Sequence, residues 1–254
     1  AHIHSRDGTQ GMNTGIQDAC NLGWKLAMVS RGTANPRLLN SYHSERWPVG
    51  RTLLRATDRV FGVFARAAAS NGAVTSLRRV MVRRVVAPAL SSPRVRAFAF
   101  HFVSQLGIRY RKSPAVTEGE PRLSKGPRAG DRLPDARVLR DGRFAYLQQV
   151  LSSPHLHLLL CGPTAAWNRA DVMKLAEEFR DVLAIDCLTR EHSDGALVDS
   201  GGEAFTRLGV DGNAMYLIRP DGHIAFRCGG TDLRAPAAYL GRWFTAARTP
   251  ETLK

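Results

Sequence analysis

The second half of this 254-residue chain places the strongest constraint on its fold, because short apolar runs alternate there with helical patterns. Residues 155–161 (HLHLLLC) and 182–188 (VLAIDCL) are apolar runs of strand length, and a helical pattern with Asn168 as its N-cap lies between them. Two further strand-like runs flank Pro220-Asp221-Gly222, a strong turn sequence, and a helical pattern from Leu233 to Ala247 follows. This order predicts an α/β sandwich.

A short helix is expected at 203–208, and an additional hairpin comes first, since Asp141-Gly142 separates two short strand-like runs. The full order, a hairpin followed by β–α–β–α–β–β–α, predicts a thioredoxin-like α/β domain over residues 131–254. Cys161-Gly162-Pro163-Thr164 falls where a redox-active thioredoxin carries its cysteine pair, but only one cysteine is present. Because dithiol exchange requires two thiols, we expect this domain to be redox-inactive and structural, with a homodimer contact as one role.

Residues 1–112 have a different pattern, in which one polar loop is followed only by helical periodicity. We expect helices at 14–30, from Asn35-Pro36 to a break at Pro48 and Gly50, and at 52–69, 74–86 and 95–106. Their apolar faces require a sheet, which we expect to lie outside this sequence. Residues 111–134 contain four prolines and three glycines, so 113–130 is predicted to be a linker or an extended crossing segment between domains 1–112 and 131–254.

The net charge of +14 is confined to the first half of the chain. Residues 1–112 carry 18 Lys and Arg against 4 Asp and Glu, whereas residues 113–254 carry 18 of each. The basic cluster Arg78, Arg79, Arg83 and Arg84 has no interleaved aromatic residues and belongs to no nucleic-acid-binding motif. We therefore expect no specific nucleic-acid partner, and a solvated helix face is the simpler interpretation.

The remaining composition indicates a cytoplasmic protein without a membrane span or a signal peptide, because no apolar run reaches eighteen residues. The cysteines at 20, 161, 187 and 228 are far apart and have no zinc-site spacing. They are expected to be buried thiols in a reducing compartment. His2 and His4 lack an evident third ligand, so no metal site is expected.

A glycine-punctuated loop from Asp7 to Thr14 leads directly into the first helix. This arrangement brings backbone N–H groups and the positive end of a helix dipole to one place. Such a place attracts an anion or an electron-rich ring edge. From the residues alone, a capped surface helix behind a flexible loop remains the alternative.

Four runs near the start form a longer motif: Ala1-His2, Gly11-Met12-Asn13-Thr14-Gly15, Gln17-Asp18-Ala19 and Asn21-Leu22-Gly23-Trp24-Lys25-Leu26-Ala27. Together they resemble the second FAD-binding motif of flavin-dependent aromatic-ring hydroxylases, the group of phenol hydroxylase and the tetracycline and rifampicin monooxygenases. Later stretches resemble that family's following helix, the entry to its thioredoxin-like C-terminal domain and its final hairpin; these are residues 40–50, 130–135 and 216–227. The fold expected from this resemblance is the helical C-terminal part of an FAD-binding domain followed by a thioredoxin-like α/β domain.

The resemblance implies an enzyme in which FAD takes hydride from NAD(P)H and reacts with O₂ to give a C4a-hydroperoxyflavin, which hydroxylates an aromatic or polyketide-like substrate. It also implies that the backbone N–H groups of Met12 and Asn13 contact the pyrimidine edge of the flavin. Gly8 and Gly11 would permit close approach of the backbone. These four residues are the predicted cofactor-binding residues, and no catalytic residue is assigned.

Two features depart from the family pattern. The family motif opens with Gly-Asp-Ala-Ala-His, whereas this sequence starts at the second Ala, so we expect a truncated chain that lacks the dinucleotide-binding N-terminus and does not hold FAD tightly alone. Arg6-Asp7-Gly8-Thr9-Gln10-Gly11 stands where the family has Pro-Ala-Gly-Gly-Gln-Gly. The alternative is a non-catalytic interaction or dimerisation module derived from such an enzyme.

Overall fold

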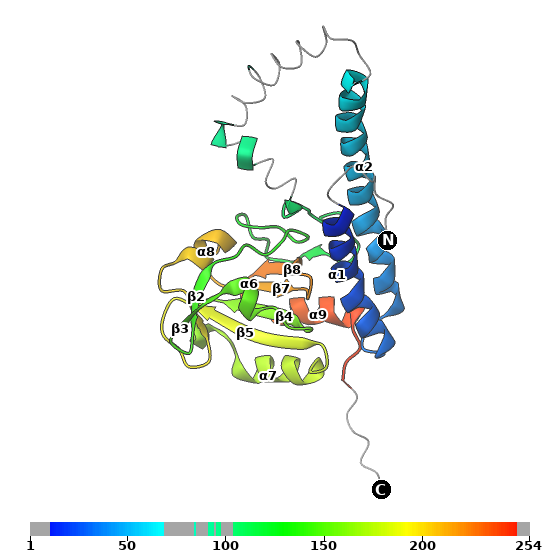
Figure 1. The fold of residues 1–254 in the computed structure, drawn as a ribbon. Coiled ribbons are helices and arrows are strands. Elements are labelled where there is room, and N and C mark those ends of the chain that lie inside the picture. Colours follow the sequence, from blue (N-terminus) through cyan, green and yellow to red (C-terminus); the bar gives the residue numbers. More distant parts are fainter. Residues whose placement is uncertain (1–10, 69–83, 85–90, 94, 98–103, 248–254) are drawn as a thin grey trace. The chain divides into compact units, whose positions relative to one another are not determined.

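The computed structural model describes residues 11–68, 84, 91–93, 95–97 and 104–247 (Figure 1). Contacts divide the chain into two compact units. The first contains Ala1–Ala19 and Arg46–Ile108, and the second contains Cys20–Glu45 and Arg109–Lys254. Residues 20–45 thus pack with the C-terminal part of the chain, although sequence patterns place them in the segment 1–112. The expected helix at 74–86, apart from residue 84, and much of the one at 95–106 lie outside the described residues.

The second unit contains an eight-stranded sheet in its described part, with the order β1-β8-β7-β4-β5-β6-β2-β3. The strands are β1 Thr117–Glu118, β2 Arg137–Arg140, β3 Arg143–Tyr146, β4 Leu156–Cys161, β5 Leu183–Thr189, β6 Leu197–Val198, β7 Ala214–Ile218 and β8 Ile224–Gly229. Strand β4 pairs in parallel with β5 and antiparallel with β7, which in turn pairs antiparallel with β8. Together with its helices, this order confirms the predicted thioredoxin-like domain, including the hairpins at Asp141-Gly142 and Pro220-Asp221-Gly222.

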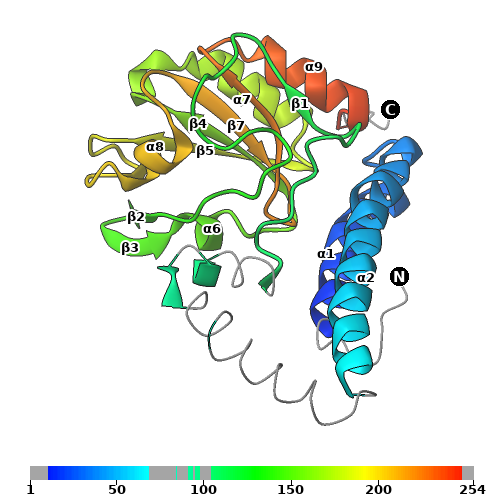
Figure 2. The same ribbon diagram turned by 90° about the horizontal axis from the view of Figure 1, so that it is seen from above.

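Helices cover both faces of this sheet (Figure 2). They are α6 Leu147–Val150, α7 Arg169–Glu178, α8 Glu203–Leu208 and α9 Arg234–Trp243, with a 3₁₀ turn η3 at Thr164–Ala166. Every residue of β4 is buried. Leu158 and Leu160 face a core shared with α7 and α9, whereas Leu159 and Cys161 face a core shared with α6 and α8. The predicted cap is present, because the Asn168 side chain accepts hydrogen bonds from the N–H groups of Ala170 and Asp171 in the first turn of α7.

Residues 20–45 contribute to the core beneath α9. Helix α1 spans Gly11–Ser30, and the 3₁₀ helix η1 spans Pro36–Leu39. Trp24, Met28 and Leu38 are buried in the same cluster as Leu156 and Met215 of the sheet. The expectation that the sheet behind these helices lies outside the sequence is therefore wrong for this segment, since part of their apolar surface packs on the C-terminal sheet. On α1, Met12, Ile16 and Leu26 remain exposed.

Helix α2 spans Asn40–Ala68 without interruption, so the predicted break at Pro48 and Gly50 is wrong, as is the separate helix at 52–69. A proline inside a helix costs about 3 kcal/mol, mainly because one backbone hydrogen bond is lost and the ring crowds the preceding turn. Here Glu45 and Arg46, in the turn before Pro48, are buried and held by ion pairs. The Thr52 hydroxyl also donates to the Pro48 carbonyl at 2.8 Å. Tertiary contacts offset the local penalty.

The segment 113–130 is an extended crossing of the sheet, one of the two forms that its composition predicts. Strand β1 pairs in parallel with β8, and Ala115 and Ala129 are buried. Buried Arg227 donates to Glu118 Oε2 at 2.8 Å and to the Lys125 carbonyl at 2.8 Å. The segment therefore contributes a sheet edge and a buried polar anchor.

Alanine substitution of two glycines tests how closely the crossing segment packs, because Gly126 lies in that segment and Gly142 lies in the exposed β2–β3 turn. Gly126 and Gly142 have φ of +77° and +74°. A Cβ at Gly126 would lie 1.9 Å from the Leu208 carbonyl oxygen, whereas a Cβ at Gly142 meets nothing within 4 Å. We expect Gly142→Ala to cost about 1–2 kcal/mol from backbone strain alone, and Gly126→Ala to cost at least about 1 kcal/mol more. Urea unfolding measures the free energy of unfolding of both variants. Equal losses of stability in the two variants would show that the crossing segment is not tightly packed at Gly126.

No helix in the ranges that the structure describes is both long enough and apolar enough to span a membrane.

Candidate functional site

The first turn of α1 contains three of the four predicted cofactor-binding residues. Gly11, Met12 and Asn13 begin the helix, and Gly8 lies outside the described residues. The Met12 side chain is 75% exposed, and the first turn carries no acidic side chain. Because the first N–H groups of a helix have no intrahelical acceptor, this end offers donors and a positive dipole to an electron-rich group.

Buried polar contacts in the first unit fix the turns that follow. Arg46 of α2 donates from Nε to Asp18 Oδ1 at 2.6 Å and from Nη2 to the Thr14 carbonyl at 3.4 Å. The Gln105 side chain donates from Nε2 to Thr14 Oγ1 at 2.7 Å. All four residues are buried. The start of α1 is thus held by contacts to α2 and to residue 105, which is the rigidity a cofactor contact requires.

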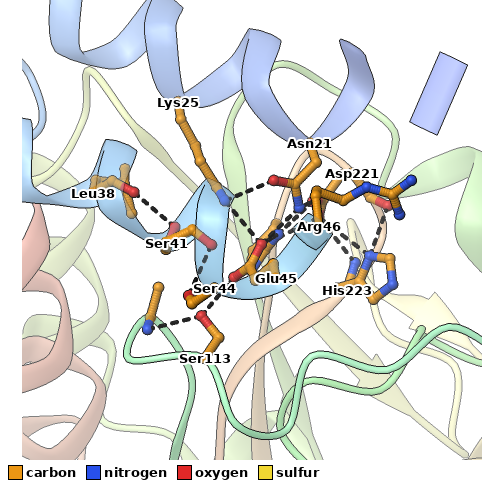
Figure 3. A network of polar contacts seen from close by, with 12 residues as sticks. Asn21, Lys25, Leu38, Ser41, Ser44, Glu45, Arg46, Ser113, Asp221 and His223 are labelled. Atoms are coloured by element: carbon orange, nitrogen blue, oxygen red, sulfur yellow. Dashed lines mark hydrogen bonds and ion pairs between the residues drawn. The ribbon is translucent and has the colours of Figure 1, made fainter. Parts of the chain in front are cut away.

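A second polar cluster lies within the second unit, around the carboxylate of Glu45 (Figure 3). Arg219 donates to both carboxylate oxygens, from Nη1 to Oε1 at 2.7 Å and from Nη2 to Oε2 at 2.9 Å. Asn21 and Lys25 of α1 donate to Oε2 at 2.6 and 2.8 Å. The Ser113 hydroxyl donates to Oε1 at 2.6 Å. Five hydrogen bonds therefore converge on one buried carboxylate, and we call this set with Asp221 the Glu45 cluster.

Arg219 connects this cluster to the β7–β8 turn. Its Nε donates to Asp221 Oδ1 at 3.0 Å, and the Asn21 amide donates to Asp221 Oδ2 at 3.2 Å. The guanidinium carbon lies 5.2 Å from the ring centroid of Trp24 and 5.4 Å from that of Tyr110. The Asp221 side chain is 4% exposed, and that of Arg219 is 1% exposed. The positive charges of Lys25 and Arg219 thus balance the two carboxylates in a site without water access.

Burial and charge shift the pKa values of these groups strongly. Burial raises the pKa of Glu45, but the Arg219 charge and hydrogen bonds outweigh it and lower this pKa to about 2. Burial and the nearby Arg219 charge lower the pKa of Lys25 to about 8. Burial opposes ionisation of Asp221 too, yet the Arg219 charge holds the pKa of this carboxyl well below its usual range. The carboxylates of the cluster are therefore ionised at neutral pH.

The Glu45 cluster joins segments that sequence patterns treat separately. It contains α1, α2, the crossing segment and the β7–β8 turn, and Glu45 is 174 residues from Arg219. Sequence patterns identify Pro220-Asp221-Gly222 only as a turn and give no role to Arg219. The available signal was the charged Arg219 at the end of an otherwise apolar strand, because such a residue is rarely buried without partners.

Within the described residues, neither the thiols nor the histidines form a metal site. The four cysteines are free, and Cys161 is fully buried in β4, where burial raises the pKa of its thiol. Cys228 is buried too, but Cys20 is exposed and Cys187 is half-buried, so the expectation of buried thiols is wrong for these two. In the described part of the chain, no group of three His, Cys, Asp or Glu residues could hold a metal ion. His2 and His4 lie outside that part.

Comparisons with known proteins identify the protein family. A model of the FAD binding domain matches residues 1–57, and a model of the aromatic-ring hydroxylase C-terminal domain matches residues 126–247. The first match includes the start of α1, and the second includes strands β2 to β8 and helices α6 to α9. The chain belongs to the family of flavin-dependent aromatic-ring hydroxylases.

Two curated relatives are named as monooxygenases, and one similar solved structure is named as an aromatic hydroxylase. The chain is 35% identical over 242 residues to 6-methylpretetramide 4-monooxygenase of Streptomyces rimosus. The alignment covers 92% of this chain and 42% of the relative. It is 34% identical over 238 residues to pentachlorophenol 4-monooxygenase of Sphingobium chlorophenolicum. That alignment covers 90% of this chain and 41% of the relative. The solved structure of CabE, an aromatic hydroxylase from angucycline biosynthesis, superposes with a TM-score of 0.66 at 31% sequence identity. The superposition covers 98% of this chain and 44% of CabE. The chain thus spans about two fifths of the length of the curated relatives it matches.

Proposed function

We propose that this chain supplies the flavin-facing helix and the C-terminal domain of an FAD-dependent monooxygenase, which uses NAD(P)H and O₂ to hydroxylate an aromatic or polyketide-like substrate. The observation that supports this proposal most directly is the match of an FAD-binding model to residues 1–57, which include the start of α1. Two relatives that match most of this chain are named as monooxygenases of pentachlorophenol and of 6-methylpretetramide.

The residues at the start of α1 fit the flavin ring. When bound, FAD supplies the hydride acceptor and the oxygen-reactive centre. The backbone N–H groups of Met12 and Asn13 would hold the pyrimidine edge, where reduction places negative charge. Gly11 presents no side chain, and no acid in the first turn opposes that charge. A helix terminus stabilises a nearby charge by about 0.3–1 kcal/mol, or up to about 2 kcal/mol when partly buried.

Met12→Glu tests this placement, because it separates flavin chemistry from stability. An acid in the first turn of a helix stabilises that helix, so the variant should fold at least as well as the unmodified protein. The same negative charge would oppose formation of anionic reduced flavin. We expect the two-electron midpoint potential of bound FAD to fall by about 10–20 mV, equivalent to roughly 0.5–1 kcal/mol. Spectroelectrochemistry of the FAD-loaded full gene product that contains this chain measures the shift.

Met173→Glu is the matched control. Met173 lies in α7, in the thioredoxin-like domain, and its side chain is 62% exposed. The potential should not change in this variant. A gene product that binds no FAD would contradict the proposed function, whereas equal shifts in the two variants would contradict only the assignment of Met12 and Asn13 to the flavin edge.

A further inference from the structure

Three side chains of the second unit form a hydrogen-bonded chain outside the Glu45 cluster and outside the start of α1. The His157 ring lies between Ser153 and Asp186, with Nε2 at 2.7 Å from Ser153 Oγ and Nδ1 at 2.8 Å from Asp186 Oδ2. Ser153 precedes β4, His157 is in β4, and Asp186 is in the adjacent parallel strand β5. Leu159 is the register partner of Asp186, so His157 and Asp186 share one face of the sheet.

The hydrogen bonds determine where the protons lie. A carboxylate only accepts, so Nδ1 of His157 carries the proton that it shares with Asp186. In the neutral ring Nε2 is then an acceptor and faces the Ser153 hydroxyl. The His155 N–H also donates to Ser153 Oγ at 3.2 Å and orients this oxygen. The arrangement is that of a hydroxyl whose proton can pass to a base.

The three side chains differ in burial. The His157 side chain is 6% exposed and that of Asp186 is 12% exposed, whereas Ser153 is only partly buried. The imidazole is thus the most buried member, and it lies between two partly buried groups, the Ser153 hydroxyl and the Asp186 carboxylate. A nucleophile within hydrogen-bond reach of a base, which is oriented by a third group, defines an activated serine.

We propose that Ser153 is a nucleophile for acyl transfer from small activated carboxylic esters, with His157 as general base and Asp186 positioning His157. Ser153 Oγ forms a bond to the ester carbonyl carbon while its proton moves to His157 Nε2. The alcohol leaves as the carbonyl–oxygen bond breaks and takes that proton. Water then attacks the acyl group with the same proton transfers, so one ester and one water give one acid and one alcohol.

Acylation of the purified chain by p-nitrophenyl acetate tests this site, with peptide mass spectrometry to locate the acetyl group. We expect acetylation at Ser153 about 100-fold faster than at Ser152, because a positioned general base contributes 10²–10⁴-fold. Ser152 is the matched hydroxyl: it is exposed, and its Oγ donates to the Gln149 carbonyl at 2.6 Å. Labelling of the unmodified chain already decides the question, since equal labelling of the two serines or none at Ser153 would overturn the proposal.

Variants separate activation from a structural role. Ser153→Ala should abolish the labelling, whereas Ser152→Ala should leave it unchanged. Asp186→Asn should slow acetylation at least tenfold, and His157→Gln, which removes the general base, should slow it by about 100-fold. Acetylation of Ser153 that is unaffected by both Asp186→Asn and His157→Gln would show that the three side chains only brace the strands.

Discussion

Replacement of Arg219 by methionine is expected to lower the free energy of unfolding by about 3–5 kcal/mol. Arg219 forms both hydrogen bonds of a bidentate pair with Glu45 and also pairs with Asp221. Methionine fills much of the same volume but leaves two buried carboxylates with Lys25 as the single remaining cation of the cluster. Removing one partner of a buried pair is costly because the other charge stays desolvated. Urea unfolding followed by circular dichroism measures the loss.

Arg234→Met provides the control for this experiment. Arg234 pairs with Asp232 at 2.7 Å, but the two side chains are 91% and 53% exposed. An exposed ion pair contributes about 0–1 kcal/mol, so this variant should unfold almost as the unmodified chain does. If Arg219→Met costs no more than Arg234→Met, the Glu45 cluster does not stabilise the second unit.

The order of elements in the thioredoxin-like domain could be predicted because its signals are local. Asp141-Gly142 and Pro220-Asp221-Gly222 mark their own turns, and Asn168 caps its own helix. The break expected at Pro48 failed for the opposite reason. A local breaker was overridden by buried ion pairs of Glu45 and Arg46, whose partners are distant in the sequence.

The same distinction between local and long-range signals applies to the start of α1 and to the Glu45 cluster. Gly11, Met12 and Asn13 were identified through a contiguous motif, and their placement at the start of α1 agrees with it; their contact with flavin remains a prediction. The Glu45 cluster has no contiguous motif. Its members come from four segments, and only folding brings Glu45 to Arg219, so neither periodicity nor composition could identify the pair.

Acid should destabilise the second unit through Glu45 in a defined pH range. The pKa of Glu45 is about 2 in the folded chain, against 4.5 for an ordinary glutamate. The folded state therefore binds fewer protons than the unfolded state between these values, and stability present above pH 4.5 is lost as the pH falls toward 2. The loss from this one group is about 3 kcal/mol, since each pKa unit corresponds to about 1.4 kcal/mol.

Glu45→Gln isolates this contribution from those of the other carboxylates. The amide cannot ionise, so the difference in unfolding free energy between the unmodified chain and this variant should be largest above pH 4.5 and should shrink by about 3 kcal/mol toward pH 2. Urea unfolding across this range gives the difference directly. Glu177→Gln is the matched control, because Glu177 is exposed and its pair with Arg180 contributes at most about 1 kcal/mol. A difference for Glu45→Gln that stays constant with pH would mean that Glu45 is not held ionised by Arg219, because a carboxylate stabilised by that guanidinium must resist protonation in the folded state.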